Sequence, residues 1–354
     1  MKKIIIPSLM VCAMIVSCGS PSTEKADNTA NANQQADKDL LTKAKGIFQP
    51  LPERADNPEN PITEAKVKLG KMLYYDTRLS KTGNNSCNSC HNLATYGVDN
   101  VATSKGDAGK NGERNSPTVF NAAFNVAQFW DGRAKDVEEQ AGGPILNPVE
   151  MAIPSKEYLE KKLRDAKDYD EMFKAVFPDD KQPITYTNIT KSIAAFERTL
   201  VTPAPFDAYL KGDATALNDD QKLGLRMFIE TGCTQCHMGS GLGGTLFQKF
   251  GLFADYRTLT NSTTNDEGKK KQSNQAGDKD VFKASSLRNI AKTAPYFHDG
   301  SVSDLNKAVV IMGKTQLNKE LSDAEVGPIV AFLNSLTGTV AEDVKTPPAT
   351  LTKK

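Results

Sequence analysis

The chain is poor in histidine, tryptophan and aromatic residues generally, and it has no excess of charge of either sign. Of its 354 residues, three are histidines, one is tryptophan and 7% are aromatic. Lysine and arginine number 44 against 43 acidic residues, so the basic excess typical of nucleic-acid binding is missing. After residue 17 no apolar run approaches the ~20 residues that span a bilayer. These features exclude nucleic acid as the partner and exclude a membrane-spanning fold.

The N-terminal segment has the composition of a targeting sequence followed by a tether. A basic start and an apolar run over residues 4–16 have the lengths of a signal peptide. Cys18 follows among small residues, as in a lipoprotein cleavage site, and an ordinary secretory signal is the alternative. Residues 19–39 are small and polar, which predicts a flexible tether. We therefore expect a signal peptide over 1–17, a lipidated tether over 18–43, and a body held by its lipid on the periplasmic side of the cell envelope.

Four of the six cysteines lie in two C-x-x-C pairs, each followed directly by a histidine. The pairs read CNSCH at residues 87–91 and CTQCH at residues 233–237. This motif attaches c-type haem, because two thiols at that spacing reach the porphyrin vinyl groups and the next imidazole ligates the iron. A zinc site would leave both histidines without a role and would join pairs 146 positions apart. The predicted attachment residues and proximal ligands of two covalent haems are Cys87, Cys90, His91, Cys233, Cys236 and His237.

The two halves of the chain resemble each other. The tripeptide KLG precedes the haem motifs at residues 68–70 and 222–224, each time in a segment with helical apolar spacing. Further on, FWDG at 129–132 parallels FHDG at 297–300. Strand-like alternation is scarce, so we predict a mainly α fold of two cytochrome-c-like helical domains. The expected divisions are an N-terminal haem domain over 44–203, a C-terminal haem domain over 204–340 and a tail over 341–354. The clearest amphipathic helices are expected at 155–176, 187–200 and 321–336.

Three stretches resemble the bacterial diheme cytochrome c peroxidases. They are SCNSCHNLATYGVDN at 86–100, the segment from RNSPTVF to NPVEM at 114–151, and SLRNIAKTAPYFHDG to AVVIM at 286–312. The similarity runs from about residue 45 to residue 340. It implies reduction of hydrogen peroxide to water at the N-terminal haem, with two electrons from a small periplasmic donor entering at a His/Met-ligated C-terminal haem. The donor would be a monohaem cytochrome c or a cupredoxin, and the family also implies a homodimer.

The same resemblance assigns roles to single residues. Met312 matches the methionine ligand of the C-terminal haem, and Trp130 matches the electron conduit between the haems. Glu150 matches the distal carboxylate that acts as acid and base, with Gln140 and Phe129 in the same pocket.

A calcium ion is also implied, at Asn115, Thr293 and Pro295, whose amide and carbonyl oxygens suit a hard cation. His298 matches a histidine that does not bind iron. It is nevertheless the alternative to Met312 as the sixth ligand, since no other histidine lies outside the haem motifs.

One feature departs from the family pattern. Many members close the peroxidatic haem with a distal histidine on a loop, but here the matching position is Asp107 and no histidine lies between the haem motifs. We expect Asp107 to stay in water on a flexible, glycine-rich loop, and the oxidised enzyme to have an open N-terminal haem. Closure by Lys105 or Lys110 is the alternative.

Two other function classes stay open at this point. A diheme electron carrier would need no distal carboxylate, so the presence of Glu150, Gln140 and Phe129 argues against this class. A protein-oxidising diheme enzyme of the methylamine-utilisation type would use a tyrosine on the second haem. Tyr296 is near the relevant region, but Met312 makes this reading the weaker one.

Overall fold

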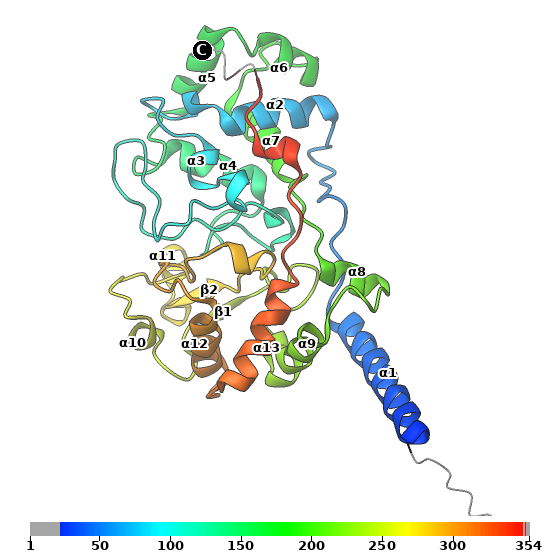
Figure 1. The fold of residues 1–354 in the computed structure, drawn as a ribbon. Coiled ribbons are helices and arrows are strands. Elements are labelled where there is room, and N and C mark those ends of the chain that lie inside the picture. Colours follow the sequence, from blue (N-terminus) through cyan, green and yellow to red (C-terminus); the bar gives the residue numbers. More distant parts are fainter. Residues whose placement is uncertain (1–21, 350, 352–354) are drawn as a thin grey trace, which may run out of the picture.

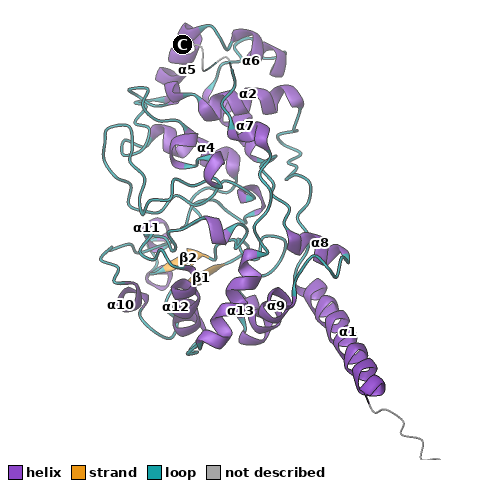
Figure 2. Cartoon of the chain, in the orientation of Figure 1, coloured by secondary structure: helices purple, strands orange, loops and turns teal. Residues whose placement is uncertain are grey.

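The computed structural model describes residues 22–349 and 351, with side chains from residue 34 onward. The fold is mostly helical, and its helices gather in two groups, one above the other in Figures 1 and 2. The lower group also holds a short antiparallel pair of strands, β1 (Phe247–Lys249) and β2 (Val281–Lys283). None of the helices in the described part of the chain is long and apolar enough to cross a membrane. The expected signal peptide and Cys18 lie outside the described residues.

The helices divide between these two groups. The first group contains α2 (Glu64–Tyr75), α3 (Cys87–Cys90), α4 (Val137–Leu146), α5 (Lys156–Ala166), α6 (Asp170–Val176) and α7 (Tyr186–Glu197). The second group contains α8 (Pro205–Lys211), α9 (Asp219–Thr231), α10 (Tyr256–Thr260), α11 (Lys270–Ser273), α12 (Leu305–Leu317) and α13 (Asp323–Asn334). At the ends of the described chain lie α1 (Ser22–Ile47) and α14 (Glu342–Lys345). The helix expected over 155–176 is divided in two at Lys167, which has a φ of 60°.

Each half is built on two helices that touch at a glycine. A Cβ added to Gly70 on α2 would overlap the carbonyl oxygen of Ser192 on α7. In the same way a Cβ on Gly224 of α9 would overlap the carbonyl oxygen of Pro328 on α13. The KLG repeat therefore marks the closest approach of the central helix pair in each half, which is why both copies keep a residue without a side chain there.

The buried apolar side chains form separate cores in the two halves. Leu69 and Leu73 of α2 meet Ile193 and Phe196 of α7 in the first core. The second core joins α8, α9 and α13, and a third cluster lies between β2 and α12. The prediction of a mainly α fold with two halves is thus confirmed.

The segment expected as a flexible tether is helical from Ser22 onward, so that expectation is corrected. The polar stretch contains Ala, Glu, Gln and Lys, which favour helix. Leu40 and Ala44 in the last turns of this helix, and Phe48 directly after it, are spaced four apart and are buried in the core of the second half. In Figure 1, α1 projects from the lower group. Residues 40–48 therefore pack with the second half of the fold. The domain start expected at residue 44 stays a prediction.

The C-terminal tail packs against the first half of the fold. Val340 is part of the first core, and Val344 and Leu351 pack against it. The Tyr75 hydroxyl donates a hydrogen bond of 2.6 Å to the Val344 carbonyl oxygen. The tail expected as a separate segment after residue 340 thus packs against the first half of the fold. The N-terminal helix therefore packs against the second half, and the C-terminal tail packs against the first half.

The halves meet in a nearly symmetric pair of backbone contacts. The Asn115 N–H of the first half donates to the His298 carbonyl oxygen at 2.8 Å, and the Lys283 N–H of the second half donates to the Trp130 carbonyl oxygen at 2.8 Å. Asn115 lies 15 residues before Trp130, and Lys283 lies 15 residues before His298. The Trp130 and His298 ring centroids are 6.4 Å apart. The FWDG and FHDG copies of the repeat therefore face each other across the interface.

Candidate functional site

A cavity of about 460 Å³ lies in the first half beside the first haem motif. Cys87, Cys90 and His91 form part of its wall, and the two cysteines form no disulfide. The His91 Nδ1 lies 2.9 Å from the Pro117 carbonyl oxygen, which fixes Nδ1 as the donor and leaves Nε2 for iron. Burial lowers the pKa of His91, so the imidazole is neutral, as an iron ligand must be.

The three expected distal residues lie in the wall of the same cavity. Gln140 comes from α4, and Glu150 follows in the turn after that helix, where its N–H donates to the Asn147 carbonyl oxygen at 3.0 Å. Phe129 adds an aromatic ring. Burial raises the pKa of Glu150 above its usual value, against the opposing effects of Arg133 and Asn147. The cavity thus combines an imidazole with a carboxyl group that exchanges a proton nearer to neutral pH.

Trp130 lies in a tight turn between the two halves. The Gln128 N–H donates to the Ala134 carbonyl oxygen at 2.7 Å, and Phe129 has a φ of 64°. The turn directs Trp130 toward the interface, where its Nε1 donates to the Asn115 carbonyl oxygen at 2.8 Å. Trp130 lines the first cavity and also a second one.

The second cavity, of about 380 Å³, surrounds the second haem motif. Its wall includes Cys233, Cys236 and His237, and the two cysteines form no disulfide. The His237 Nδ1 lies 3.1 Å from the Leu242 carbonyl oxygen, so Nε2 is again the nitrogen left for iron. Burial lowers the pKa of His237 as well. The two haem motifs thus hold their histidines in the same way.

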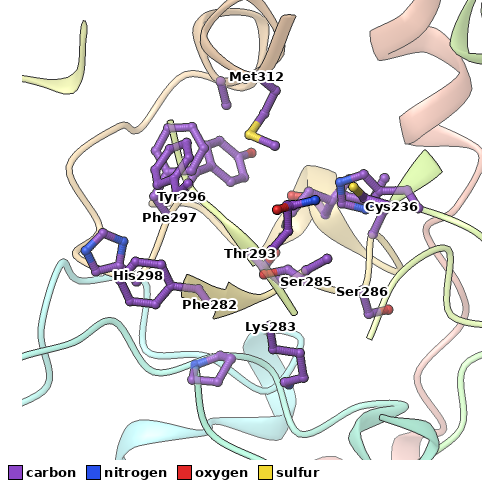
Figure 3. A pocket seen from close by; sticks show the side chains of 18 of the residues that line it. Cys236, Phe282, Lys283, Ser285, Ser286, Thr293, Tyr296, Phe297, His298 and Met312 are labelled. Carbon is purple, nitrogen blue, oxygen red and sulfur yellow. Dashed lines mark hydrogen bonds between the residues drawn. The ribbon is translucent and has the colours of Figure 1, made fainter. Parts of the chain in front are cut away.

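Both candidates for the sixth ligand line the second cavity. Met312 comes from α12, and Figure 3 shows its sulfur pointing into the cavity. His298 is 2% exposed and stacks on Phe282 with ring centroids 4.2 Å apart. The rings of Tyr256 and Phe250 also contact it. Its Nε2 has no hydrogen-bond partner among the described residues. His298 is therefore enclosed by aromatic rings, whereas Met312 has a flexible side chain at the cavity wall.

The three residues expected at a calcium site line the second cavity close to the interface. The Asn115 Nδ2 donates to the Val101 carbonyl oxygen at 3.0 Å. In the described part of the chain, the Asn115 Oδ1 and the carbonyl oxygens of Thr293 and Pro295 accept no hydrogen bond. These oxygens fit a cation that prefers oxygen ligands. No three His, Cys, Asp or Glu side chains of the described residues gather into a metal site, so a cation would depend on amide and carbonyl oxygens.

The loop over residues 103–112 was expected to be flexible, with Asp107 in water, but its Asp107 side chain is buried. Asp107 is 7% exposed, and its carboxylate accepts hydrogen bonds of 2.8 Å from both the N–H and the hydroxyl of Thr82. Burial acts to raise the pKa of Asp107, but these hydrogen bonds outweigh it and the pKa is lowered. The Asp107 N–H donates to the Glu150 carbonyl oxygen at 2.7 Å. The expectation that Asp107 stays in water is therefore wrong, because the side chain anchors the loop.

The same loop is a small hairpin and not a flexible segment. The Gly106 N–H donates to the Lys110 carbonyl oxygen at 2.8 Å, and a Cβ on Gly106 would overlap the Val149 carbonyl oxygen. Lys105 and Lys110 are exposed, whereas Gly106 lines the first cavity. The glycines thus allow close packing onto the segment that carries Glu150.

Sequence reasoning missed several charged residues at the cavities, among them Arg133, Glu197 and Lys283. Arg133 places its guanidinium 3.5 Å from the centre of the Phe129 ring and lines the first cavity. Glu197 lines that cavity too, and burial raises its pKa to about 8. Lys283 lines the second cavity. Arg133 directly follows the FWDG motif, which was a usable signal, but nothing in the sequence marks the other two.

Comparison with known proteins agrees with this geometry. Residues 64–215 match the family model described as di-haem cytochrome c peroxidase, and residues 221–337 match the cytochrome c model. A cytochrome c551 peroxidase of Pseudomonas aeruginosa is 48% identical over 308 residues, which cover 86% of this chain and 88% of that protein. The chain belongs to the di-haem cytochrome c peroxidase family. A cytochrome c551 peroxidase of Nitrosomonas europaea is 49% identical over 288 residues, covering 81% and 83% of the two chains.

A solved structure also resembles this di-haem peroxidase. The crystal structure of a MauG-like protein associated with microbial copper homeostasis superposes with a TM-score of 0.75 at 28% identity, covering 84% of this chain and 97% of that one. The family resemblance seen in the sequence is confirmed. The protein is an oxidoreductase of the cytochrome c peroxidase type, with haem c in its two cytochrome-c-like domains, peroxide as substrate and an electron donor.

Proposed function

We propose that the chain reduces hydrogen peroxide to water at the haem of the first cavity, using electrons that enter at the haem of the second cavity. The observation that carries this assignment is Glu150, a carboxyl group with a raised pKa in the same cavity as His91. The second cavity offers a thioether from Met312 in place of a carboxyl group. A carboxyl group is suited to moving protons, and a thioether to holding an electron-transfer iron. The functional difference between the two haems therefore rests on these two side chains.

The protein residues of the first cavity supply the proton chemistry. The bound haem would supply the iron at which the O–O bond is cleaved. Glu150 takes a proton from the peroxide oxygen nearer the iron and delivers it to the departing oxygen, which then leaves as water. Gln140 and Phe129 line the same cavity as this carboxyl group. Arg133 lowers the pKa of Glu150 and so opposes the effect of burial on it.

Trp130 is our candidate for the connection between the haems. It lines both cavities, and its indole N–H is fixed by the Asn115 carbonyl oxygen. The calcium ion assigned to Asn115, Thr293 and Pro295 would lie beside this contact and stabilise the interface. The electron donor would be a monohaem cytochrome c or a cupredoxin in the periplasm. Lipidation at Cys18 and a homodimer complete the proposed arrangement.

A steady-state assay with reduced cytochrome c or cupredoxin tests the function directly. The holoenzyme is expected to oxidise two donor molecules for each hydrogen peroxide consumed. An enzyme that exchanges electrons with the donor but consumes no peroxide would instead be the electron carrier considered above.

Replacing Met312 by alanine is expected to lower the midpoint potential of the C-terminal haem or to convert it to high spin. The reason is that thioether ligation favours ferrous iron. Optical redox titration and the spectrum of the ferric protein check this. If both haems keep their potentials in M312A and the second changes in H298A, His298 is the ligand. A change on replacing Tyr296 instead would support the methylamine-utilisation reading.

The fully oxidised enzyme is expected to turn over peroxide without earlier reduction of the C-terminal haem. Asp107 is bonded to Thr82, and the exposed Lys105 and Lys110 lie outside the wall of the first cavity, so none of these loop side chains is placed to block the N-terminal haem. The check is to start the assay with oxidised and with prereduced enzyme and to compare the initial rates. A lag that appears only with the oxidised enzyme would mean that another residue closes the site.

A further inference from the structure

The second cavity is lined almost entirely by uncharged side chains. Lys283 is the one Lys, Arg, Asp or Glu among the residues that form its wall. It is the last residue of β2 and is 9% exposed. Figure 3 shows it on the side of the cavity away from Met312. Burying an ammonium group in such a wall is costly unless an anion pairs with it.

The described part of the chain does not provide that anion. Within the described residues, Lys283 forms no ion pair and its Nζ makes no hydrogen bond. The carboxylate whose charge acts on it is Asp131, which already forms ion pairs of 2.8 Å with Arg114 and 3.0 Å with Arg133. Burial accordingly lowers the pKa of Lys283 to about 8. A ligand that brings an anion into this cavity would meet an unpaired cation here.

The backbone fixes where this cation lies. The Lys283 N–H is bonded to the Trp130 carbonyl oxygen, in the position that Asn115 takes in the other half. At these two equivalent positions the first half has the neutral amide of Asn115 and the second half has the ammonium group of Lys283. Lys283 is thus held at the interface, on the edge of the second cavity that faces the first half.

We propose that the Lys283 ammonium group binds a propionate carboxylate of the haem attached to Cys233 and Cys236. Haem c carries two propionates, and these are the anions that it brings into this cavity. The ion pair satisfies a buried cation and orients the haem with a propionate toward the interface. A positive charge beside the haem also favours its reduced state, so Lys283 raises the potential at which the C-terminal haem accepts electrons. The assignment depends on haem attachment and not on peroxide reduction.

The test compares K283M with K283R in the holoenzyme by optical redox titration that resolves the two haems. K283M is expected to shift the C-terminal haem to a lower midpoint potential, because the propionate then lacks its cation. K283R, which keeps the charge, is expected to stay close to the wild type. Lys249, an exposed lysine on β1, provides the matched control, and K249M should leave both potentials unchanged.

The ordering of the variants separates ion pairing from packing. A packing role predicts that methionine is tolerated and the larger arginine is not, which is the reverse of the expected order. A pyridine haemochrome assay checks that each variant holds two haems. If K283M loses a haem, K283Q serves in its place and should shift the potential in the same direction. An unchanged C-terminal potential in a variant with both haems, or a shift confined to the N-terminal haem, overturns the proposal.

Discussion

Replacing Glu150 by glutamine is expected to slow the cleavage of hydrogen peroxide by about 10²–10⁴-fold, the usual contribution of a positioned acid–base group. Glutamine keeps the size of the side chain but cannot carry the proton. Both haems and their ligands should be retained, since Glu150 contributes to the distal wall and not to the haem motif. Stopped-flow mixing of the oxidised enzyme with peroxide measures the effect. Glu139, exposed on α4, provides the control E139Q, which should react like the wild type.

The pH dependence of this reaction gives a second check on Glu150. The carboxylate form is the base, and burial raises its pKa above the usual 4.5. The rate of peroxide cleavage should therefore fall as the pH is lowered through this raised pKa, and E150Q should lose that acidic limb. Wild-type rates in E150Q, or an unchanged acidic limb, would remove Glu150 from the mechanism.

Replacing Cys233 and Cys236 together by serine is expected to leave one haem per chain and to destabilise the second half. Haem bound to these residues fills a cavity of about 380 Å³ lined by α12, α13 and β2, so its loss leaves a large unfilled space in the core. The pyridine haemochrome assay counts the haems. Limited proteolysis should then cut residues 206–336 well before the first half.

The matched variant replaces Cys87 and Cys90 by serine. The remaining haem should then be the C-terminal haem with His/Met ligation. Two haems in the C233S/C236S protein, or one haem in the wild type, would contradict the assignment of the two attachment motifs.

Sites whose residues lie close together in the sequence were predictable from the sequence alone. The haem motifs fix their own cysteines and histidines within five residues, and the structure places each set at the wall of one cavity. Glu150 could be named only through the family motif, because an isolated glutamate carries no local signal. The structure brings it together with Gln140 and Phe129, which are distant from the haem motif in the sequence.

Features that depend on tertiary packing were not predictable. The composition of residues 19–39 indicated a tether. Leu40 and Phe48, however, pack into a core whose other residues lie more than 150 positions further along the chain. Asp107 looked like a solvated loop residue because its partner Thr82 lies on the other side of the haem motif. Lys283 lies in no motif, and its importance appears only from the uncharged wall around it.

The electron paramagnetic resonance spectrum of the fully oxidised protein, recorded before and after one equivalent of hydrogen peroxide, tests the account most directly. We predict one high-spin ferric signal from the N-terminal haem and one low-spin signal from the His/Met haem. Peroxide should remove the high-spin signal first. Two low-spin signals that peroxide leaves unchanged would mean that both irons carry two protein ligands, and would contradict an open peroxidatic site in the first cavity.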